Sequence, residues 1–226
     1  MKELVITEKH TELEIYNYLN RINDEFFVKR ADGLSKKFRK FLKNSPLNKQ
    51  TLLNSYCFRN VTVLLFGQHL KNSLEFGLVF IVNINGKHSS YEIYSENNSE
   101  TKASKTIPHF FSRYKERQSV NKTGIELIKH FYINNIKDTE LKSIHMYKGK
   151  EQIFSVFKEG VGLSVYEDMG KYKIKVIKTY ISNELLKESQ AEITNDILKD
   201  ETIAEEEYKQ RISRYKRQNK LSRLLY

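Results

Sequence analysis

The pattern of apolar and polar residues opens the chain with two predicted helices. Across residues 8–27 the apolar side chains recur at spacings near three and four, which is typical of an amphipathic helix. A shorter helix is predicted over residues 34–43, with apolar residues on one face and lysines and an arginine on the other. Asn44-Ser45-Pro46 ends it, because proline cannot continue a helix.

The middle of the chain follows a different pattern and predicts strands. Residues 60–68, 73–84 and 87–96 are rich in Val, Ile, Phe and Tyr. Asn85-Gly86 lies between the last two. A tight hairpin turn needs positive φ at both of its central residues, and Asn and Gly adopt positive φ more readily than other residues. We expect an antiparallel meander here, followed by an exposed loop at residues 96–100 that is the best domain boundary.

The second half begins with helices and ends with strands. A helix is predicted over residues 106–118, with Pro108 in its first turn, and another over residues 124–136. Three strands follow, over residues 152–157, 161–167 and 172–182. In the last strand, alternation assigns one face to Tyr172, Ile174, Val176, Lys178 and Tyr180.

These elements predict an α+β fold of antiparallel sheets with flanking helices. Residues 1–98 form the helical start and the meander, and residues 99–182 form a helix-helix-three-strand unit. Residues 183–226 form a charge-segregated helical tail: its first part is rich in acids, and residues 208–226 hold seven cations and no acid. The basic end is interpreted as a nucleic-acid arm, as a segment that folds back on the acids, or as an oligomerisation device.

The positive net charge of the chain predicts a polyanionic partner. The net charge is +11 and the sequence pI about 9.4, which attracts nucleic acid, with RNA favoured here. An AT-rich coding sequence also enriches Lys and Asn, so the distribution of charge matters more than its sum. The predicted nucleic-acid contacts are Lys36, Lys37, Lys40, Lys173, Lys175, Lys178, Arg214 and Arg217.

Composition also narrows the class of protein. The single cysteine, Cys57, excludes an internal disulfide and a cysteine-based zinc site, favours a reducing compartment, and is expected to be buried or half-buried. No apolar run reaches membrane-spanning length and the start lacks a signal-peptide layout, so we expect a cytoplasmic protein without a membrane partner. No glycine-rich phosphate loop and no paired histidine spacing occurs, so neither a cofactor nor a metal is expected.

The helix at 106–118 is the candidate for chemistry. Its core stripe would be Ile107, Phe110, Phe111 and Tyr114, and its opposite stripe His109, Arg113, Glu116 and Arg117. An imidazole can take the proton of a ribose 2′-OH, and guanidinium groups can bind the phosphate. The same stripe is also what an ordinary solvated helix face with an ion pair would show.

Pro108–Arg117 resembles the H-x-x-x-R-x-x-x-R helix of several phage and toxin members of the barnase–EndoU–colicin–RelE-like nuclease superfamily. It also resembles uncharacterised phage and mobile-element proteins with an H-F-F-x-R-Y-x-x-R pattern, and the resemblance covers residues 104–182. It implies a metal-independent ribonuclease with His109 as base, Arg113 and Arg117 as phosphate ligands, and Thr179 or Ser182 as hydrogen-bond donor. Nothing matches the first 100 residues, and the general acid is open between His145 and Lys178.

Three functional hypotheses follow. The chain binds nucleic acid without cleaving it, or it is a metal-independent endoribonuclease of toxin or phage type. In the third hypothesis it is a structural or assembly protein that forms a homo-oligomer through residues 183–226. Binding ranks slightly above catalysis, because it asks for fewer residues in a fixed geometry.

Overall fold

The structure is a computed structural model of the 226-residue chain. It describes residues 4–43, 50–69, 74–94, 101–135, 139–147, 150–170 and 172–186. The chain divides into two compact units, Met1–Ser182 and Asn183–Tyr226. In the second unit, only residues 183–186 are described, among them the 3-10 turn η3 (Asn183–Leu185).

The helices lie in two groups along the chain. The first group is α1 (Glu12–Ile22), the π-helical turn η1 (Asn23–Phe27), the 3-10 turn η2 (Val28–Arg30) and α2 (Ala31–Lys43). The second is α3 (Pro108–Arg117) and α4 (Gly124–Asn134). The start of α1 is fixed by a capping box, in which the Thr11 side chain accepts from the Glu14 N–H and the Glu14 carboxylate accepts from the Thr11 N–H.

Within the described residues, one sheet of nine strands lies between the two groups of helices. The strands are β1 (Gln50–Phe58), β2 (Val61–His69), β3 (Leu74–Ile84), β4 (Lys87–Ile93), β5 (Thr101–Thr106), β6 (Thr139–Tyr147), β7 (Lys150–Phe157), β8 (Gly160–Met169) and β9 (Tyr172–Ser182). Their order is β1-β2-β3-β4-β5-β9-β8-β7-β6, antiparallel throughout except for the β5–β9 pair, which is parallel. The α+β class with a mostly antiparallel sheet is therefore confirmed.

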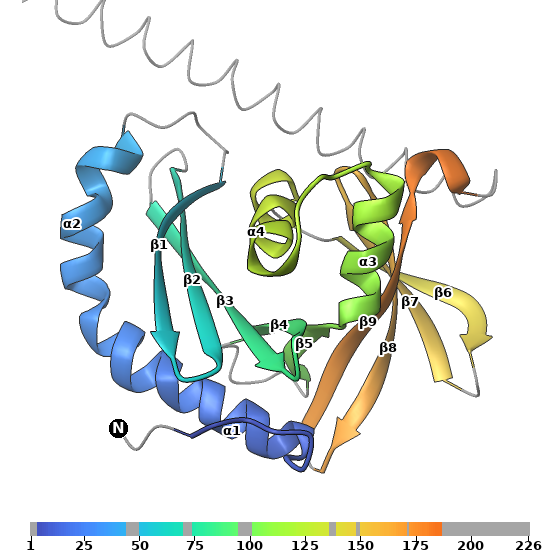
Figure 1. Cartoon of the computed structure of the whole chain (residues 1–226), viewed down its shortest axis with the longest axis horizontal. Helices are drawn as coiled ribbons and strands as arrows, with labels where there is room; N and C mark the ends of the chain where they lie inside the picture. Colours follow the sequence, from blue (N-terminus) through green and yellow to red (C-terminus); the bar gives the residue numbers. More distant parts are fainter. Residues whose placement is uncertain are drawn as a thin grey trace, which may run out of the picture. The chain divides into compact units, whose positions relative to one another are not determined.

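Helices cover both faces of the sheet. In Figure 1 the strands curl around α3 and α4, while α1 and α2 lie on the outer side. Along β2, Val63 packs in the cluster with α1 and Leu65 packs against Phe38 of α2. Leu64 and Phe66 point the other way, into the cluster formed with α3 and α4. The first half of the chain therefore contributes strands to the same core layers as the second half.

The continuous sheet corrects the predicted domain boundary. β4 and β5 pair with each other across residues 95–100, and β5 pairs with β9. A division into 1–98 and 99–182 therefore does not separate two compact units, because the hydrogen-bonded ladder runs through it.

Several predicted elements form with shifted ends. The helix expected over residues 8–27 is α1 followed by the π-helical turn, and β2, β3, β4, β7, β8 and β9 form at the expected places. Asn85 and Gly86 have φ of 52° and 78°, which confirms the hairpin turn. β1, β5 and β6 were not predicted: β5, with the sequence TKASKT, has no apolar alternation and is a strand only because β4 and β9 flank it. Cys57, expected buried or half-buried, is exposed.

A β-bulge in β9 corrects the predicted face pattern. Ile177 pairs with Ser164 and Thr179 with Leu163, so Lys178 is the extra residue. As a result Ile174 and Val176 pack with α1, whereas Ile177 and Tyr180 both pack with α3 and α4. Strict alternation had placed Tyr180 with Ile174, which is wrong because the bulge reverses the faces.

Candidate functional site

The helix predicted to carry chemistry is oriented as its pattern indicates. Phe110, Phe111 and Tyr114 of α3 are buried against the sheet and α4. His109 is exposed and Arg113 is partly buried, on the side away from that core. The helix is held to the sheet at its start, where the Ile107 N–H donates to the Ile177 carbonyl over 3.2 Å.

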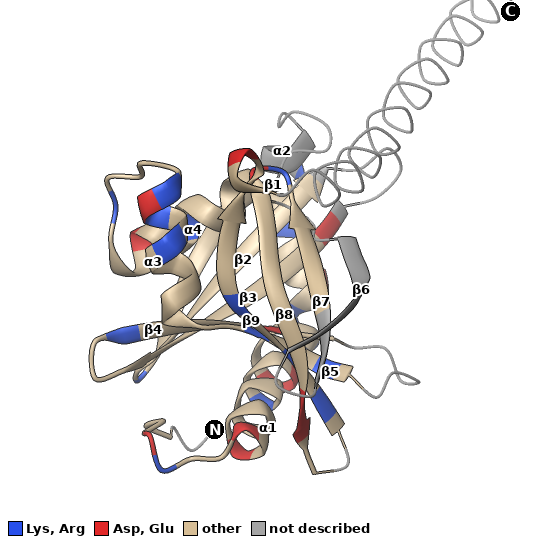
Figure 2. Ribbon diagram, turned by 90° about the vertical axis from the view of Figure 1, so that its right-hand side faces the viewer, with Lys and Arg blue, Asp and Glu red and all other residues tan. Residues whose placement is uncertain are grey.

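Both arginines of this helix contact groups of the chain itself. Arg113 Nη1 lies 2.8 Å from Glu116 Oε2, an ion pair between a partly exposed arginine and an exposed glutamate. Arg117 Nη1 donates to the main-chain carbonyl of Tyr180. In Figure 2, cationic and acidic segments lie next to each other on α3 and α4. This part of the surface is therefore of mixed charge.

The two predicted donors from β9 lie on different faces. Tyr180 packs with α3, and neighbouring strand side chains point in opposite directions, so Thr179 lies on the face away from α3. Ser182 is on the face of Tyr180 and is buried. The structure thus brings Arg117 and the end of β9 together, but places Thr179 on the other side of the sheet from His109 and Arg113.

A polar network that was not predicted joins α3, α4 and the turn between β7 and β8. The Tyr114 hydroxyl donates to Glu159 Oε2 over 2.7 Å and lies 3.0 Å from His130 Nδ1. Asn135 Nδ2 donates to the same carboxylate oxygen over 2.9 Å, and Asn135 Oδ1 accepts from the Glu159 N–H over 3.1 Å. The Glu159 carbonyl accepts from Gln118 Nε2 and from the Tyr180 hydroxyl.

This network fastens the β7–β8 turn to both helices. Burial, and then the hydrogen bond to Glu159, raise the pKa of Tyr114, so the phenol stays protonated and donates. Burial also raises the pKa of Tyr180. The Glu159 N–H, its carbonyl and its Oε2 each have a partner within the chain, as expected for a structural contact. The members of the network come from four separate segments, α3, the end of α4, the β7–β8 turn and β9, so no local spacing in the sequence reveals it.

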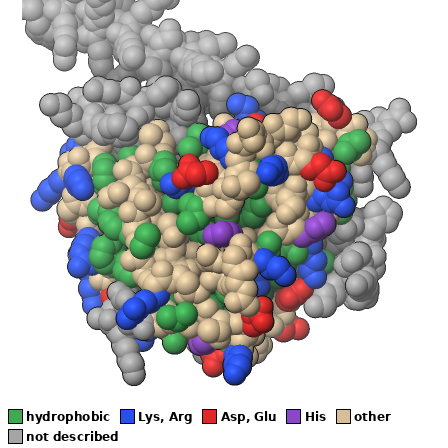
Figure 3. Space-filling model, viewed as in Figure 1, with side chains coloured by type: hydrophobic (Ala, Val, Ile, Leu, Met, Phe, Trp, Pro, Cys, Tyr) green, Lys and Arg blue, Asp and Glu red, His purple; other side chains and the backbone are tan. Residues whose placement is uncertain are grey.

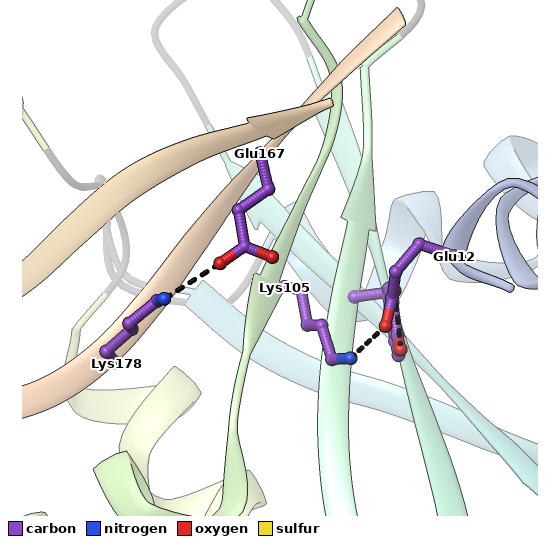
Figure 4. Close-up of polar contacts among 5 residues, drawn as sticks. Glu12, Lys105, Glu167 and Lys178 are labelled. Atoms are coloured by element: carbon purple, nitrogen blue, oxygen red, sulfur yellow. Dashed lines mark hydrogen bonds and ion pairs between the residues drawn. The ribbon is translucent and has the colours of Figure 1, made fainter. Parts of the chain in front are cut away.

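The three predicted lysines of β9 have three different environments. Lys173 is exposed, whereas Lys175 is only 1% exposed. Lys178 Nζ donates to Glu167 Oε1 over 2.8 Å (Figure 4). Figure 4 also shows Lys105 paired with Glu12 of α1, which in turn accepts from the Tyr91 hydroxyl. The strand lysines therefore form no continuous cationic surface, and Lys175 in particular is too buried to contact a polyanion as predicted.

The cationic surface is instead the outer face of η2 and α2. Residues 28–43 contain seven cations and one acid, Asp32. Phe38 is buried on Leu65 and Leu34 is partly buried, so the rest of the helix faces outward. Figure 3 shows Lys and Arg side chains gathered along the margin where α2 lies. The exposed cations with described side chains are Lys29, Arg30, Lys36, Lys37 and Arg39. None of these five is in an ion pair with a described carboxylate.

Two of these cations lie over aromatic rings. The Arg30 guanidinium is 4.2 Å from the centroid of the Phe26 ring, and Lys37 Nζ is 5.1 Å from that of Phe38. Arg30 Nη1 also donates to the Phe26 carbonyl over 3.0 Å. This geometry depends on η1, whose π-helical turn presents Phe26 beside Tyr56 of β1.

Some predicted residues are outside the part of the chain that the structure describes. The side chains of Lys40 and His145, the tail cations Arg214 and Arg217, and the proposed oligomerisation device at 183–226 lie outside the described residues, apart from residues 183–186. Among the described residues, no three His, Cys, Asp or Glu side chains gather in a way that could hold a metal ion.

Comparison with known proteins finds no match: no family model, curated protein or solved structure is similar to this chain. Within the described part of the chain, no helix is both long enough and apolar enough to cross a membrane.

Proposed function

We propose that this chain binds nucleic acid through the cationic face of η2 and α2. The observation that carries the proposal is the group of five exposed cations, Lys29, Arg30, Lys36, Lys37 and Arg39, with no described carboxylate paired to any of them. Elsewhere the described cations on α3 and α4 include ion pairs, Arg113 with Glu116 and Lys129 with Glu126. Unpaired cations on one helix face attract a phosphate backbone and release its counterions.

The arrangement along the helix supports a linear polyanion. Lys29 and Lys36 are seven residues apart, about two helical turns, and so are Arg30 and Lys37. The cations thus form two rows along the helix, on the side not occupied by Phe38. Such rows can follow successive phosphates of one strand.

The binding test is a salt titration. We expect the logarithm of the association constant to fall linearly with the logarithm of salt concentration, by about 0.7–0.9 for each phosphate contact. Lys36→Ala is expected to lower that slope by about one, because one contact is lost. The measurement is fluorescence anisotropy of a labelled oligonucleotide at several salt concentrations.

Lys122→Ala is the matched control for this prediction. Lys122 is also exposed, but it lies in the α3–α4 connection, which belongs to the opposite face of the sheet. The substitution Lys122→Ala lowers the net charge of the protein by one, as Lys36→Ala does. Equal effects of the two variants would show that binding follows net charge alone and would exclude α2 as the contact surface.

A ribonuclease activity is the second candidate, supported by the exposure of His109 one turn before Arg113 on α3. We expect cleavage of RNA to continue in excess EDTA and to fall about a hundredfold in His109→Ala, the usual contribution of a general base. The control is His88→Ala, which removes a partly buried histidine of β4, outside α3. Cleavage that EDTA abolishes, or that His109→Ala leaves intact, would contradict this candidate.

A further inference from the structure

The junction between α1 and α2 is rich in aromatic side chains. Phe26, Phe27, Tyr56 and Phe58 form an aromatic cluster with ring centroids 4.9–5.4 Å apart in edge-to-face contacts. Phe27 and Phe58 are buried, whereas Phe26 and Tyr56 are partly exposed. The exposed side of this cluster therefore lies next to the cations of η2 and α2.

Arg30 is fixed on this cluster. Its guanidinium lies 4.2 Å from the centroid of the Phe26 ring, and Nη1 donates to the carbonyls of Phe26 and Glu25 over 3.0 and 3.4 Å. An arginine held in this way has lost most of its rotamer freedom before any ligand binds. The residue is nevertheless exposed, so the planar group is accessible from outside.

A planar cation on an aromatic ring is a stacking surface for a nucleobase. Bases of single strands stack on aromatic rings and on guanidinium planes, whereas the bases of a duplex are already stacked on each other. The charges of α2 alone would serve a duplex and a single strand alike. The guanidinium of Arg30, fixed beside these charges, adds a stacking surface that favours a single strand over a duplex.

We propose that the ligand of the α2 surface is a single-stranded nucleic acid, one base of which stacks on the Arg30 guanidinium. This inference rests on the proposed function, because it needs the phosphates of the same strand to lie along Lys29, Lys36 and Lys37. It adds the class of nucleic acid and the residue that selects it.

The test compares Arg30→Lys with Lys36→Ala. Arg30→Lys removes the planar group and its hydrogen bonds to the Phe26 and Glu25 carbonyls but keeps the charge, so base stacking is lost while attraction to phosphate remains. The probes are oligo-dT, oligo-rU, an abasic single strand of the same length and a duplex of that length. We expect Arg30→Lys to weaken binding of oligo-dT or oligo-rU about fivefold or more, and to change binding of the abasic strand and of the duplex less than about twofold.

Lys36→Ala serves as the charge control and should weaken binding of all four probes. Unchanged duplex binding in Arg30→Lys also shows that the variant is folded. Tighter binding of oligo-rU than of oligo-dT assigns the surface to RNA, the reverse order assigns it to DNA, and either order agrees with a single-stranded ligand.

Two negative results have different meanings. In the first, Lys36→Ala weakens binding, but Arg30→Lys either weakens binding of duplex and single strand equally or changes neither. The single-strand inference is then overturned and the proposed function remains. If neither variant changes binding of any probe, α2 is not the contact surface, and both proposals are overturned.

Discussion

Phe131→Ala is expected to lower the free energy of unfolding by about 3–5 kcal/mol, the usual cost of removing a buried phenylalanine. Phe131 is 1% exposed and lies at the centre of the cluster between α3, α4 and the sheet. Its ring makes edge-to-face contacts with Phe110, Phe111, Tyr114, Tyr132 and Phe157. No single neighbour can fill the space that the ring would leave. Guanidinium chloride unfolding with linear extrapolation measures the loss.

Two further variants make this prediction specific. Phe131→Leu leaves most of the volume in place and should cost less than Phe131→Ala. Val28→Ala removes apolar atoms from a residue that is 60% exposed and should stay within about 0.5 kcal/mol of the parent. A loss below about 1 kcal/mol for Phe131→Ala would show that this cluster is not the closely packed core described here.

Gly160→Ala is expected to destabilise the protein by about 3 kcal/mol, through a steric clash instead of a cavity. Gly160 begins β8, directly after the turn that the Glu159 network fastens. A Cβ atom at this position would lie 2.5 Å from the Tyr180 hydroxyl and still closer to the Ile181 carbonyl oxygen. Neither atom can move easily, since Tyr180 donates to the Glu159 carbonyl and Ile181 is part of the β9 backbone.

Gly33→Ala is the matched control, because it makes the same chemical change at a position with free space. Apart from the backbone of α2 itself, no described atom lies within 4 Å of the Cβ position at Gly33, which is in α2. Alanine favours a helix interior over glycine, so this variant should be more stable by about 0.5–1 kcal/mol. The two substitutions should therefore shift the midpoint of thermal unfolding in opposite directions. A shift of the same sign at both sites would contradict the packing around Gly160.

The residues substituted in these two stability predictions lie apart from the proposed binding surface. Phe131 and Gly160 belong to the side of the sheet that faces α3 and α4, whereas Arg30 and Lys36 are exposed on η2 and α2. Exposed substitutions usually change stability little. A change in the affinity of the Arg30 and Lys36 variants for nucleic acid therefore reports on lost contacts and not on unfolding.

The predicted catalytic residues show which features of a site can be predicted from residue spacing alone. The stripe of α3 with His109 and Arg113 follows from the helical period, and the structure has it. That Arg117 donates to the Tyr180 carbonyl and that Thr179 faces away from α3 depends on contacts between segments about sixty residues apart. The same holds for the network of Tyr114, Glu159 and Asn135, since each comes from a different element.

Local patterns are enough to predict the helices α2, α3 and α4, the hairpin at Asn85-Gly86, most strands and the cation-rich face of α2, because each depends on periodicity or turn chemistry within a short segment. Contacts in the folded chain are needed to learn that one sheet joins both halves, that the polar segment Thr101–Thr106 is a strand, and that Lys175 is buried while Lys36 is exposed. Strand pairing and burial are set by neighbours distant along the chain, which no short segment contains. A bulge of one residue at Lys178 then suffices to reverse the face of every side chain beyond it.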